Sequence, residues 1–299
     1  MKIVVAGGGG FIGKRLCGAL SGEGYDIVIL SRSRQGAFDG ARYLRWDPSE
    51  GARWADAVGA ADAVINLAGE SIADGRWSEP RKRVLVESRI ASTRAIVAGL
   101  NRLTPKPKIF VNASAVGYYG PRGDETIDED SRPGSDFLAE LCRQWENECL
   151  DAERQGVRTV KIRIGIVLGH GGGAIAKMLL PFKLGLGGPL GSGDQWMSWV
   201  HIDDLAGLVL FLIDHPTASG PINATAPNPV TNREFAKTLG AVLRRPAFLP
   251  APAFALRLAL GEMADMLLTG QKVLPKKAQA LSYSFRHSQL KEALQSLFL

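Results

Sequence analysis

Short apolar runs rich in β-branched residues alternate with longer segments through the first two-thirds of the chain. The runs lie at residues 2–6, 26–30, 63–67, 108–111 and 160–167. Runs of this length and composition are typical of strands that are buried on both faces. We therefore expect these five segments to lie in the interior of one parallel sheet.

The segments between the runs carry apolar residues at helical spacing. Ile12, Leu16 and Leu20 fall on one face of a helix predicted over residues 11–20. A second helix is predicted over residues 78–103, because Ser78 can cap it and a proline follows in its first turn. Strands that alternate with helices predict an α/β fold, a Rossmann-type doubly wound parallel sheet with right-handed crossovers.

The pattern changes after about Gly169. A glycine-rich stretch at 171–193 surrounds one helix-like piece, and a proline-bearing stretch at 246–252 precedes an apolar helix. We expect a first, dinucleotide-binding domain over residues 1–168 and a smaller C-terminal, substrate-side lobe over residues 169–299. Residues 200–224 are expected to return to the main sheet.

Composition narrows the class of protein. The 299 residues are 45% hydrophobic, which suffices for a large core. Cys17, Cys142 and Cys149 form an odd set without zinc-ligand spacing, so we expect reduced thiols, no disulfide framework and no metal. The chain begins directly with a predicted strand, and no stretch approaches the roughly 20 apolar residues of a membrane span. A cytoplasmic location is therefore expected.

The net charge of +6 and the pI of about 9.3 are compatible with several anionic partners. No basic run is long, and no aromatic-rich nucleic-acid motif accompanies the scattered arginines. We expect an anionic cofactor and a small anionic substrate rather than nucleic acid or a membrane.

The clearest chemical motif follows the first strand. Gly7, Gly10 and Gly13 have the GxxGxxG spacing at the start of a predicted helix. Such a turn lets a pyrophosphate approach backbone N–H groups at a helix N-terminus. We include Phe11 and Ile12, which open the helix, in the predicted cofactor site. A plain structural glycine turn is the alternative.

The second strand ends in Ser31, Arg32 and Arg34, where dinucleotide folds usually carry an acidic residue for the ribose. A guanidinium binds a 2′-phosphate, whereas a carboxylate would repel it. NADP(H) is therefore the predicted cofactor, with a solvated basic loop as the alternative.

Two further strand ends belong to the predicted cofactor site. Asp47 ends a further expected strand, the third along the chain, which lies between the runs at 26–30 and 63–67; it could accept from the adenine amino group, or lie in a surface turn. Leu67, Ala68 and Gly69 end the fourth, where small residues let the chain pass close to the cofactor.

Five motifs in order along the chain carry a resemblance to a known family. They are GGGGFIG at 7–13, INLAGESI at 65–72, SRIAST at 88–93, VNASAVGYYG at 111–120 and WVHIDDLA at 199–206. Together they resemble the extended short-chain dehydrogenase/reductases. INLAGESIADGRW at 65–77, FLAELCRQWE at 137–146, RIGIVLG at 163–169 and LPKKAQALSYSF at 274–285 resemble the atypical YfcH-like branch, called nucleoside-diphosphate-sugar epimerase family proteins.

The resemblance covers essentially the whole chain and implies an epimerase or oxidoreductase fold. Residues 249–299 resemble a small C-terminal module of unassigned function in this branch. The superfamily's catalytic Tyr-x-x-x-Lys pair has no counterpart here. Aligning the tyrosine with Phe137 places Leu141 at the lysine, and aligning it with Leu138 places Cys142 there.

Other residues must carry any proton transfer. The candidates are Ser114, Tyr118, Tyr119 and Glu70, with Asp124, Glu125, Cys142 and His201 considered beside them. Lys82 and Arg89 lie on one face of the second helix and are expected on the substrate side. Lys183, Trp196 and Trp199 flank the glycine-rich stretch and predict a lid; solvated lysines and core tryptophans are the alternatives.

Two function hypotheses follow. The first is an NADP(H)-dependent epimerase or reductase that acts on a sugar-like or other polar anionic compound. The second is a non-catalytic NADP(H)-binding sensor that acts through a protein partner, resembling a role suggested for some relatives in cell division. The sequence leaves the substrate and the oligomeric state open.

Overall fold

A computed structural model describes residues 1–38 and 40–298. Within these residues, eight strands form one twisted central sheet. The strand order is β12-β8-β6-β5-β1-β2-β4-β3, and every neighbouring pair is parallel except β3 with β4. The strands are β1 (Lys2–Ala6), β2 (Asp26–Ser31), β3 (Gly36–Phe38), β4 (Ala41–Arg45), β5 (Ala63–Asn66), β6 (Ile109–Ala115), β8 (Arg158–Ile164) and β12 (Gly220–Ala224). The predicted Rossmann-type fold is confirmed.

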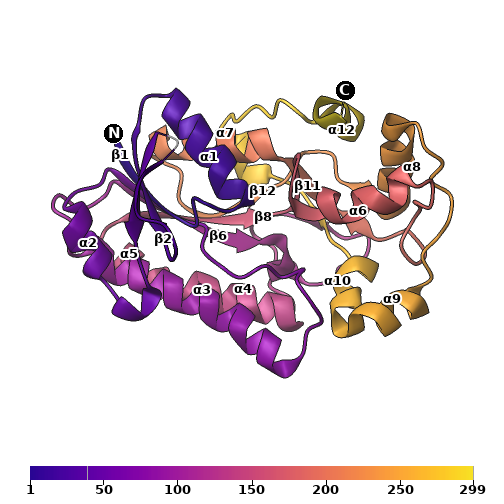
Figure 1. Ribbon diagram of the computed structural model, residues 1–299, viewed down its shortest axis with the longest axis horizontal. Coiled ribbons are helices and arrows are strands. Elements are labelled where there is room, and N and C mark those ends of the chain that lie inside the picture. Colours follow the sequence, from indigo (N-terminus) through magenta and orange to yellow (C-terminus); the bar gives the residue numbers. More distant parts are fainter. Residues whose placement is uncertain (39, 299) are drawn as a thin grey trace.

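Helices cover both faces of this sheet (Figure 1). One face carries α1 (Phe11–Gly22) and α7 (Ile202–Asp214). The other face carries α2 (Arg53–Val58), α3 (Glu79–Leu100), α4 (Phe137–Asn147) and α5 (Leu150–Arg154). Because the crossover connections make these strands parallel, their carboxyl ends all lie at the same end of the sheet.

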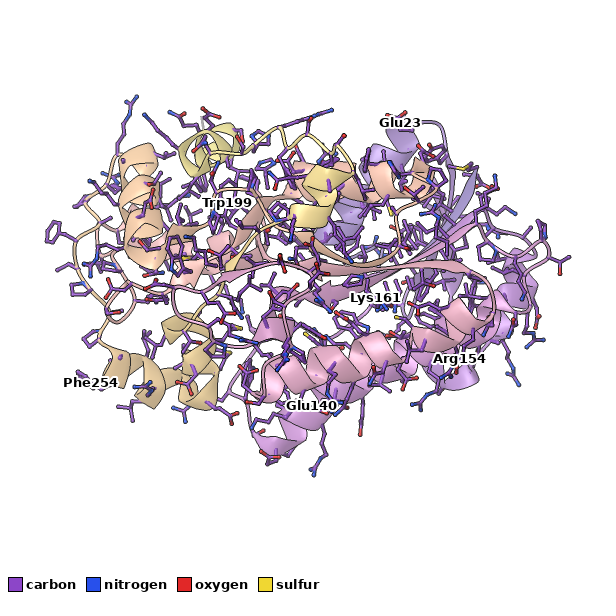
Figure 2. The ribbon with its side chains drawn as sticks, turned by 180° about the vertical axis from the view of Figure 1, so that it is seen from behind. Glu23, Glu140, Arg154, Lys161, Trp199 and Phe254 are labelled. Carbon is purple, nitrogen blue, oxygen red and sulfur yellow. The ribbon has the colours of Figure 1, made fainter. Side chains whose placement is uncertain are left out.

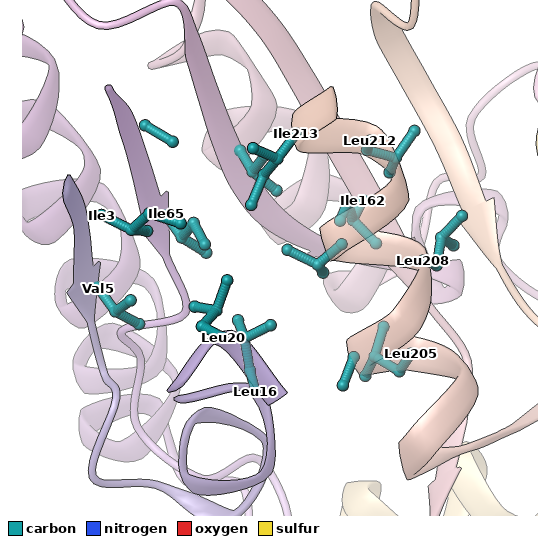
Figure 3. Packing of buried hydrophobic residues seen from close by; sticks show 14 of the residues in the cluster. Ile3, Val5, Leu16, Leu20, Ile65, Ile162, Leu205, Leu208, Leu212 and Ile213 are labelled. Atoms are coloured by element: carbon teal, nitrogen blue, oxygen red, sulfur yellow. The ribbon is translucent and has the colours of Figure 1, made fainter. Parts of the chain in front are cut away.

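The core between the α1/α7 layer and the sheet is built from branched aliphatic side chains (Figure 3). Leu16 and Leu20 of α1 and Leu208 of α7 are fully buried. They pack in one cluster with strand residues that include Ile3, Val5, Ile65 and Ile162. Burying one such side chain contributes roughly 1.5–3 kcal/mol, so this layer fixes α1, and with it the turn before α1, on the sheet.

The second half of the chain adds helices and small ladders beside the sheet (Figure 1). The helices are α6 (Gly173–Lys183), α8 (Asn232–Leu243), α9 (Ala253–Leu260), α10 (Asp265–Leu268), α11 (Lys276–Ala280) and α12 (Leu290–Phe298). The ladders pair β7 (Thr126–Ile127) with β14 (Lys272–Val273), β9 (Ile166–Leu168) with β11 (Trp199–His201), and β10 (Trp196–Met197) with β13 (Val230–Thr231). Among the described residues, no helix has the length and apolarity needed to cross a bilayer.

The C-terminal segment is attached to the start of α7. Both carboxylate oxygens of Asp204 accept backbone N–H groups, from Arg286 at 2.7 Å and His287 at 2.9 Å. The hydroxyl of Tyr283 donates to the Asp204 carbonyl at 2.8 Å. These bonds explain why the second aspartate of the IDD segment, Asp204, is buried.

Two strand predictions need correction. The run at 160–167 was predicted as one strand, but it is two, because the chain leaves the main sheet at Gly165. A side chain there would overlap the carbonyl oxygen of Ser198, where β9 turns to pair with β11. The short β3 was not predicted, so the strand before Asp47 is the fourth along the chain and ends at Arg45.

Candidate functional site

The glycine turn presents bare backbone in front of α1. Gly7 adopts a positive φ of 79°, and its carbonyl accepts from the N–H of Gly10 at 3.0 Å. A side chain at Gly13 would overlap the Gly7 carbonyl, whereas one at Gly9 would meet nothing within 4 Å. Gly7 and Gly13 therefore shape the turn, and Gly9 and Gly10 leave open space at the helix N-terminus.

Phe11 closes one side of this turn. Added side chains at Gly169 and Gly173 would come within 3 Å of its ring, so the segment after β9 packs directly on it. Ile12 is half-buried and packs with the core on the α1 face of the sheet. Both residues therefore position the turn from the sides.

The end of β2 lies next to the turn, because Ala6 of β1 pairs with Leu30. Ser31 holds the following loop by accepting from the N–H of Arg34 at 3.1 Å. The Arg34 guanidinium lies 5.7 Å from the ring centre of Tyr43. The Arg32 side chain is 76% exposed, so two guanidinium groups flank this strand end.

Glu70 reaches this basic edge from the end of β5. Its carboxylate accepts from Arg32 at 3.1 Å and lies 3.9 Å from Arg81. The structure thus places this catalytic candidate in an ion pair with a predicted cofactor residue. Asp47 is exposed and accepts from the N–H of Ser49 at 2.9 Å; this hydrogen bond holds the pKa of Asp47 below its usual value.

The end of β5 approaches the turn closely. A side chain at Gly7 would come within 2.8 Å of the Leu67 carbonyl group. The N–H of Ala68 donates to the buried Asn66, whose amide also bonds Asn112 on β6 at 2.8 Å. The predicted cofactor residues of β1, β2 and β5 therefore meet at one edge of the sheet.

Ser114 and Tyr119 belong to a buried polar network that the sequence did not reveal. The Ser114 hydroxyl donates to Glu146 at 2.7 Å, and Glu146 receives two hydrogen bonds from Arg163, at 2.8 and 2.9 Å. Tyr119 accepts from Arg163 at 2.9 Å and donates to Asn223 at 2.7 Å. Burial raises the pKa of Tyr119 to about 12, so this phenol stays protonated at neutral pH.

Tyr118 differs from the other catalytic candidates. Its side chain is half-buried, and its ring lies over the Arg163 guanidinium, with 3.5 Å between the guanidinium carbon and the ring centre. Its hydroxyl has no hydrogen-bond partner within residues 1–38 and 40–298. Of the four candidates, Tyr118 is the one whose polar group remains available.

The helix that would carry the Tyr-Lys pair is apolar at the relevant positions. Phe137 packs edge-on against Trp77 with ring centres 5.3 Å apart, and Leu138 lies against Gly117. Leu141 and Cys142 are each 2% exposed. Neither alignment therefore offers a phenol and an ammonium group to a ligand.

We expect the three cysteines to be inert in the folded protein. Burial raises the pKa of Cys142 to about 12, that of Cys17 to about 11, and that of Cys149 still further. Three pKa units lower the reactive thiolate fraction roughly 1,000-fold. Labelling with a disulfide reagent should thus proceed only after denaturation. Rapid native labelling of Cys142 would contradict this and make the thiol a reactive group.

The predicted substrate-side residues fall into different environments. Lys82 contacts the C-terminal segment, pairing with Glu262 at 2.5 Å. Arg89 is 7% exposed, and burial lowers its pKa. Lys183 is exposed at the end of α6.

The two tryptophans are not equivalent. The Trp196 indole donates to Asp124 at 2.7 Å, and the ammonium of Lys272 lies 4.6 Å from its ring centre. Trp199 is fully buried and donates to the Asn228 carbonyl at 3.1 Å. Figure 2 shows it inside the molecule, whereas Phe254 lies at the edge. Trp199 is therefore a core residue, and the structure does not place it on a lid.

Comparison with known proteins agrees with this architecture. The profile of the "NAD dependent epimerase/dehydratase family" matches residues 3–224, and a domain of unknown function, DUF1731, matches residues 251–297. The chain is 42% identical to epimerase family protein YfhF of Bacillus subtilis, over 99% of this chain and 98% of that protein. It is 43% identical to the chloroplastic SDR39U1 homolog of Arabidopsis thaliana, over 99% and 86%.

Solved structures show the same relationship. Human epimerase family protein SDR39U1, solved with NADPH, superimposes with a TM-score of 0.89 at 37% identity and 99% coverage of both chains. The nucleoside-diphosphate sugar epimerase from Corynebacterium glutamicum gives 0.81 at 32% identity, covering 100% of this chain and 58% of that one. The resemblance inferred from the sequence motifs is confirmed, and the chain belongs to the NAD dependent epimerase/dehydratase family.

Proposed function

We propose that this protein binds NADP(H) and is an epimerase or reductase for a sugar-like or other polar anionic compound. The observation that carries the cofactor assignment is the open glycine turn in front of α1, with Arg32 and Arg34 at the adjacent strand end. The human relative solved with NADPH supports the same choice. The basic side chains of α3 support an anionic substrate.

The residues present fit this cofactor. Gly9 and Gly10 carry no side chain where a pyrophosphate would contact the N-terminus of α1, and the N–H groups of the first turn of α1 can donate to it. Arg32 and Arg34 can pair with a 2′-phosphate beside β2. When bound, the cofactor supplies or accepts a hydride at its nicotinamide ring.

Tyr118 is the residue that we propose for proton transfer. Its hydroxyl is unpaired, and the positive charge of Arg163 lies under its ring. Arg163 is itself fixed by Glu146, which also holds Ser114. In this arrangement Tyr118 donates or accepts a proton at its phenol oxygen, while the buried ion pair positions it.

A non-catalytic NADP(H) sensor that acts through a protein partner is the second candidate. It is favoured by the absence of the Tyr-Lys pair and by the burial of Ser114, which is 2% exposed. Two assays together separate the two: NADPH oxidation over a panel of polar carbonyl compounds detects a reductase, and chromatographic detection of the epimer formed from a sugar compound with NADP+ detects an epimerase, which consumes no cofactor. Turnover that is lost in Tyr118→Phe supports the enzyme, and tight binding with no turnover supports the sensor.

We also propose a domain organisation and a cellular location. Residues 1–168 would form the dinucleotide-binding domain and residues 169–299 the substrate-side lobe. Three buried, reduced thiols fit a reducing compartment such as the cytoplasm.

Arg32→Ala is expected to narrow the preference for NADPH over NADH by roughly tenfold or more. A hydrogen-bonded charge pair contributes about 1.5–3 kcal/mol, and 1.4 kcal/mol is a factor of ten in affinity. Titration calorimetry with both cofactors measures the change. Arg42→Ala, in an exposed arginine of β4, serves as the matched control. An unchanged ratio in Arg32→Ala would refute the role of Arg32.

A further inference from the structure

Arg89 is a buried cation without a carboxylate partner. Its Nη1 donates to the Leu85 carbonyl and its Nη2 to the Glu70 carbonyl, both at 2.9 Å. The buried Nε–H has no partner, and no carboxylate of the described residues forms an ion pair with this guanidinium. Removing a charge from water without a counter-charge is unfavourable, so this arrangement needs a reason.

The other buried arginine shows how this fold satisfies such a group. Arg163 is 3% exposed, and Glu146 matches its charge with two hydrogen bonds. A guanidinium has five N–H donors, and the two carbonyls use only two of those of Arg89. Trp145 lies on one side, 5.1 Å from the guanidinium carbon to its ring centre. The remaining donors of Arg89 have no acceptor among the described residues.

The unpartnered donors of Arg89 lie beneath Gly69, an exposed glycine at the edge of the sheet where the predicted cofactor residues meet. A Cβ atom at Gly69 would lie 3.2 Å from Cγ and Cζ of Arg89 and 3.4 Å from the unpartnered Nε. Gly69 is exposed and follows β5. A side chain at residue 69 would therefore crowd the unpaired guanidinium, whereas glycine keeps Arg89 within reach of a ligand at this edge of the sheet.

The strand order indicates which part of a dinucleotide reaches this point. β1 lies between β2 and β5, and the glycine turn follows β1. Arg32 and Arg34 place the 2′-phosphate, and hence the adenosine half, on the β2 side. A dinucleotide that crosses the turn must put its other half on the β5 side, where Arg89 lies.

We propose that Arg89 donates hydrogen bonds to oxygen atoms in the nicotinamide half of the cofactor, which presupposes the NADP(H) site proposed above. Arg89 thus supplies from α3 a cation that α4 lacks at Leu141 and Cys142. The ligand oxygens in turn provide the compensation that the buried guanidinium lacks within the chain.

Three probes test this assignment by titration calorimetry: NADPH, NADH and 2′,5′-ADP, which carries the 2′-phosphate but no nicotinamide half. Arg89→Met keeps a long apolar stem and removes every donor. We expect it to weaken NADPH and NADH equally, by about tenfold or more, and to leave 2′,5′-ADP unchanged. Arg32→Ala should show the opposite selectivity, weakening NADPH and 2′,5′-ADP but not NADH.

Arg94→Met is the matched control, because Arg94 lies on the same helix but pairs with Glu148 at the surface. Arg89→Lys keeps a charge and should give a smaller loss with the same selectivity, even where Arg89→Met fails to fold. Unchanged NADH affinity, or equal weakening of all three probes, would overturn the assignment and leave Arg89 as a substrate-anion or purely structural residue. If the unmodified protein binds neither NADPH nor NADH, the proposed function itself fails, and the role of Arg89 with it.

Discussion

Gly10→Val is expected to abolish NADPH binding while the fold persists. Gly10 has an ordinary φ of −77°, and a Cβ atom there meets only the Gly7 carbonyl oxygen, at 3.3 Å. The branched side chain would instead fill the space in front of α1 that the pyrophosphate needs. We expect affinity to fall by at least about 100-fold, or about 2.7 kcal/mol, in calorimetry, with a small change in melting temperature.

Gly18→Val is the matched control, since Gly18 lies on α1 and a side chain there meets nothing within 4 Å. That variant should bind NADPH normally and should not lose stability, because valine has a higher helix propensity than glycine. Unchanged affinity in Gly10→Val would mean that the glycine turn is a structural feature alone.

Glu146→Gln is expected to destabilise the protein strongly. Glutamine keeps the shape of the side chain but removes the charge that compensates the buried Arg163, whose side chain is 4% exposed. Breaking one partner of a buried pair typically costs about 3–5 kcal/mol. Equilibrium unfolding in urea should show this loss in the free energy of unfolding.

The neighbouring pair of Glu148 with Arg94 provides the comparison. The two groups lie 2.7 Å apart, but the Arg94 side chain is 68% exposed. Solvent-exposed pairs contribute about 0–1 kcal/mol, so Glu148→Gln should have a small effect. Equal losses in the free energy of unfolding of the two variants would show that burial does not determine how much each ion pair contributes to stability.

Local patterns predicted the sheet and its glycine turn because each depends on a few consecutive residues. The run at 2–6 coincides with β1, and the helix predicted from Phe11 begins at that residue. The single strand predicted over 160–167 is wrong, because the break at Gly165 depends on Ser198, which is distant in the sequence. A continuous apolar run carries no mark of where its strand changes partner.

The candidate site was less predictable for the same physical reason. The glycines and Arg32 could be found from their positions after strands. Two ion pairs join residues on different elements: Glu146 pairs with Arg163, and Glu70 pairs with Arg32. One clue was the charged residue Arg163 between Ile162 and Ile164 of β8, because burial of a charge is costly unless the charge is paired. Its partner became visible only in three dimensions.

Arg32 and Arg34, at the end of β2, are proposed to make the protein prefer NADPH to NADH. The most direct measurement is the affinity of the unmodified protein for NADPH and for NADH under one set of conditions. Tighter binding of NADPH by about tenfold or more, which corresponds to one charge-assisted contact to the 2′-phosphate, is the predicted result. Equal affinities, or a preference for NADH, would contradict the account.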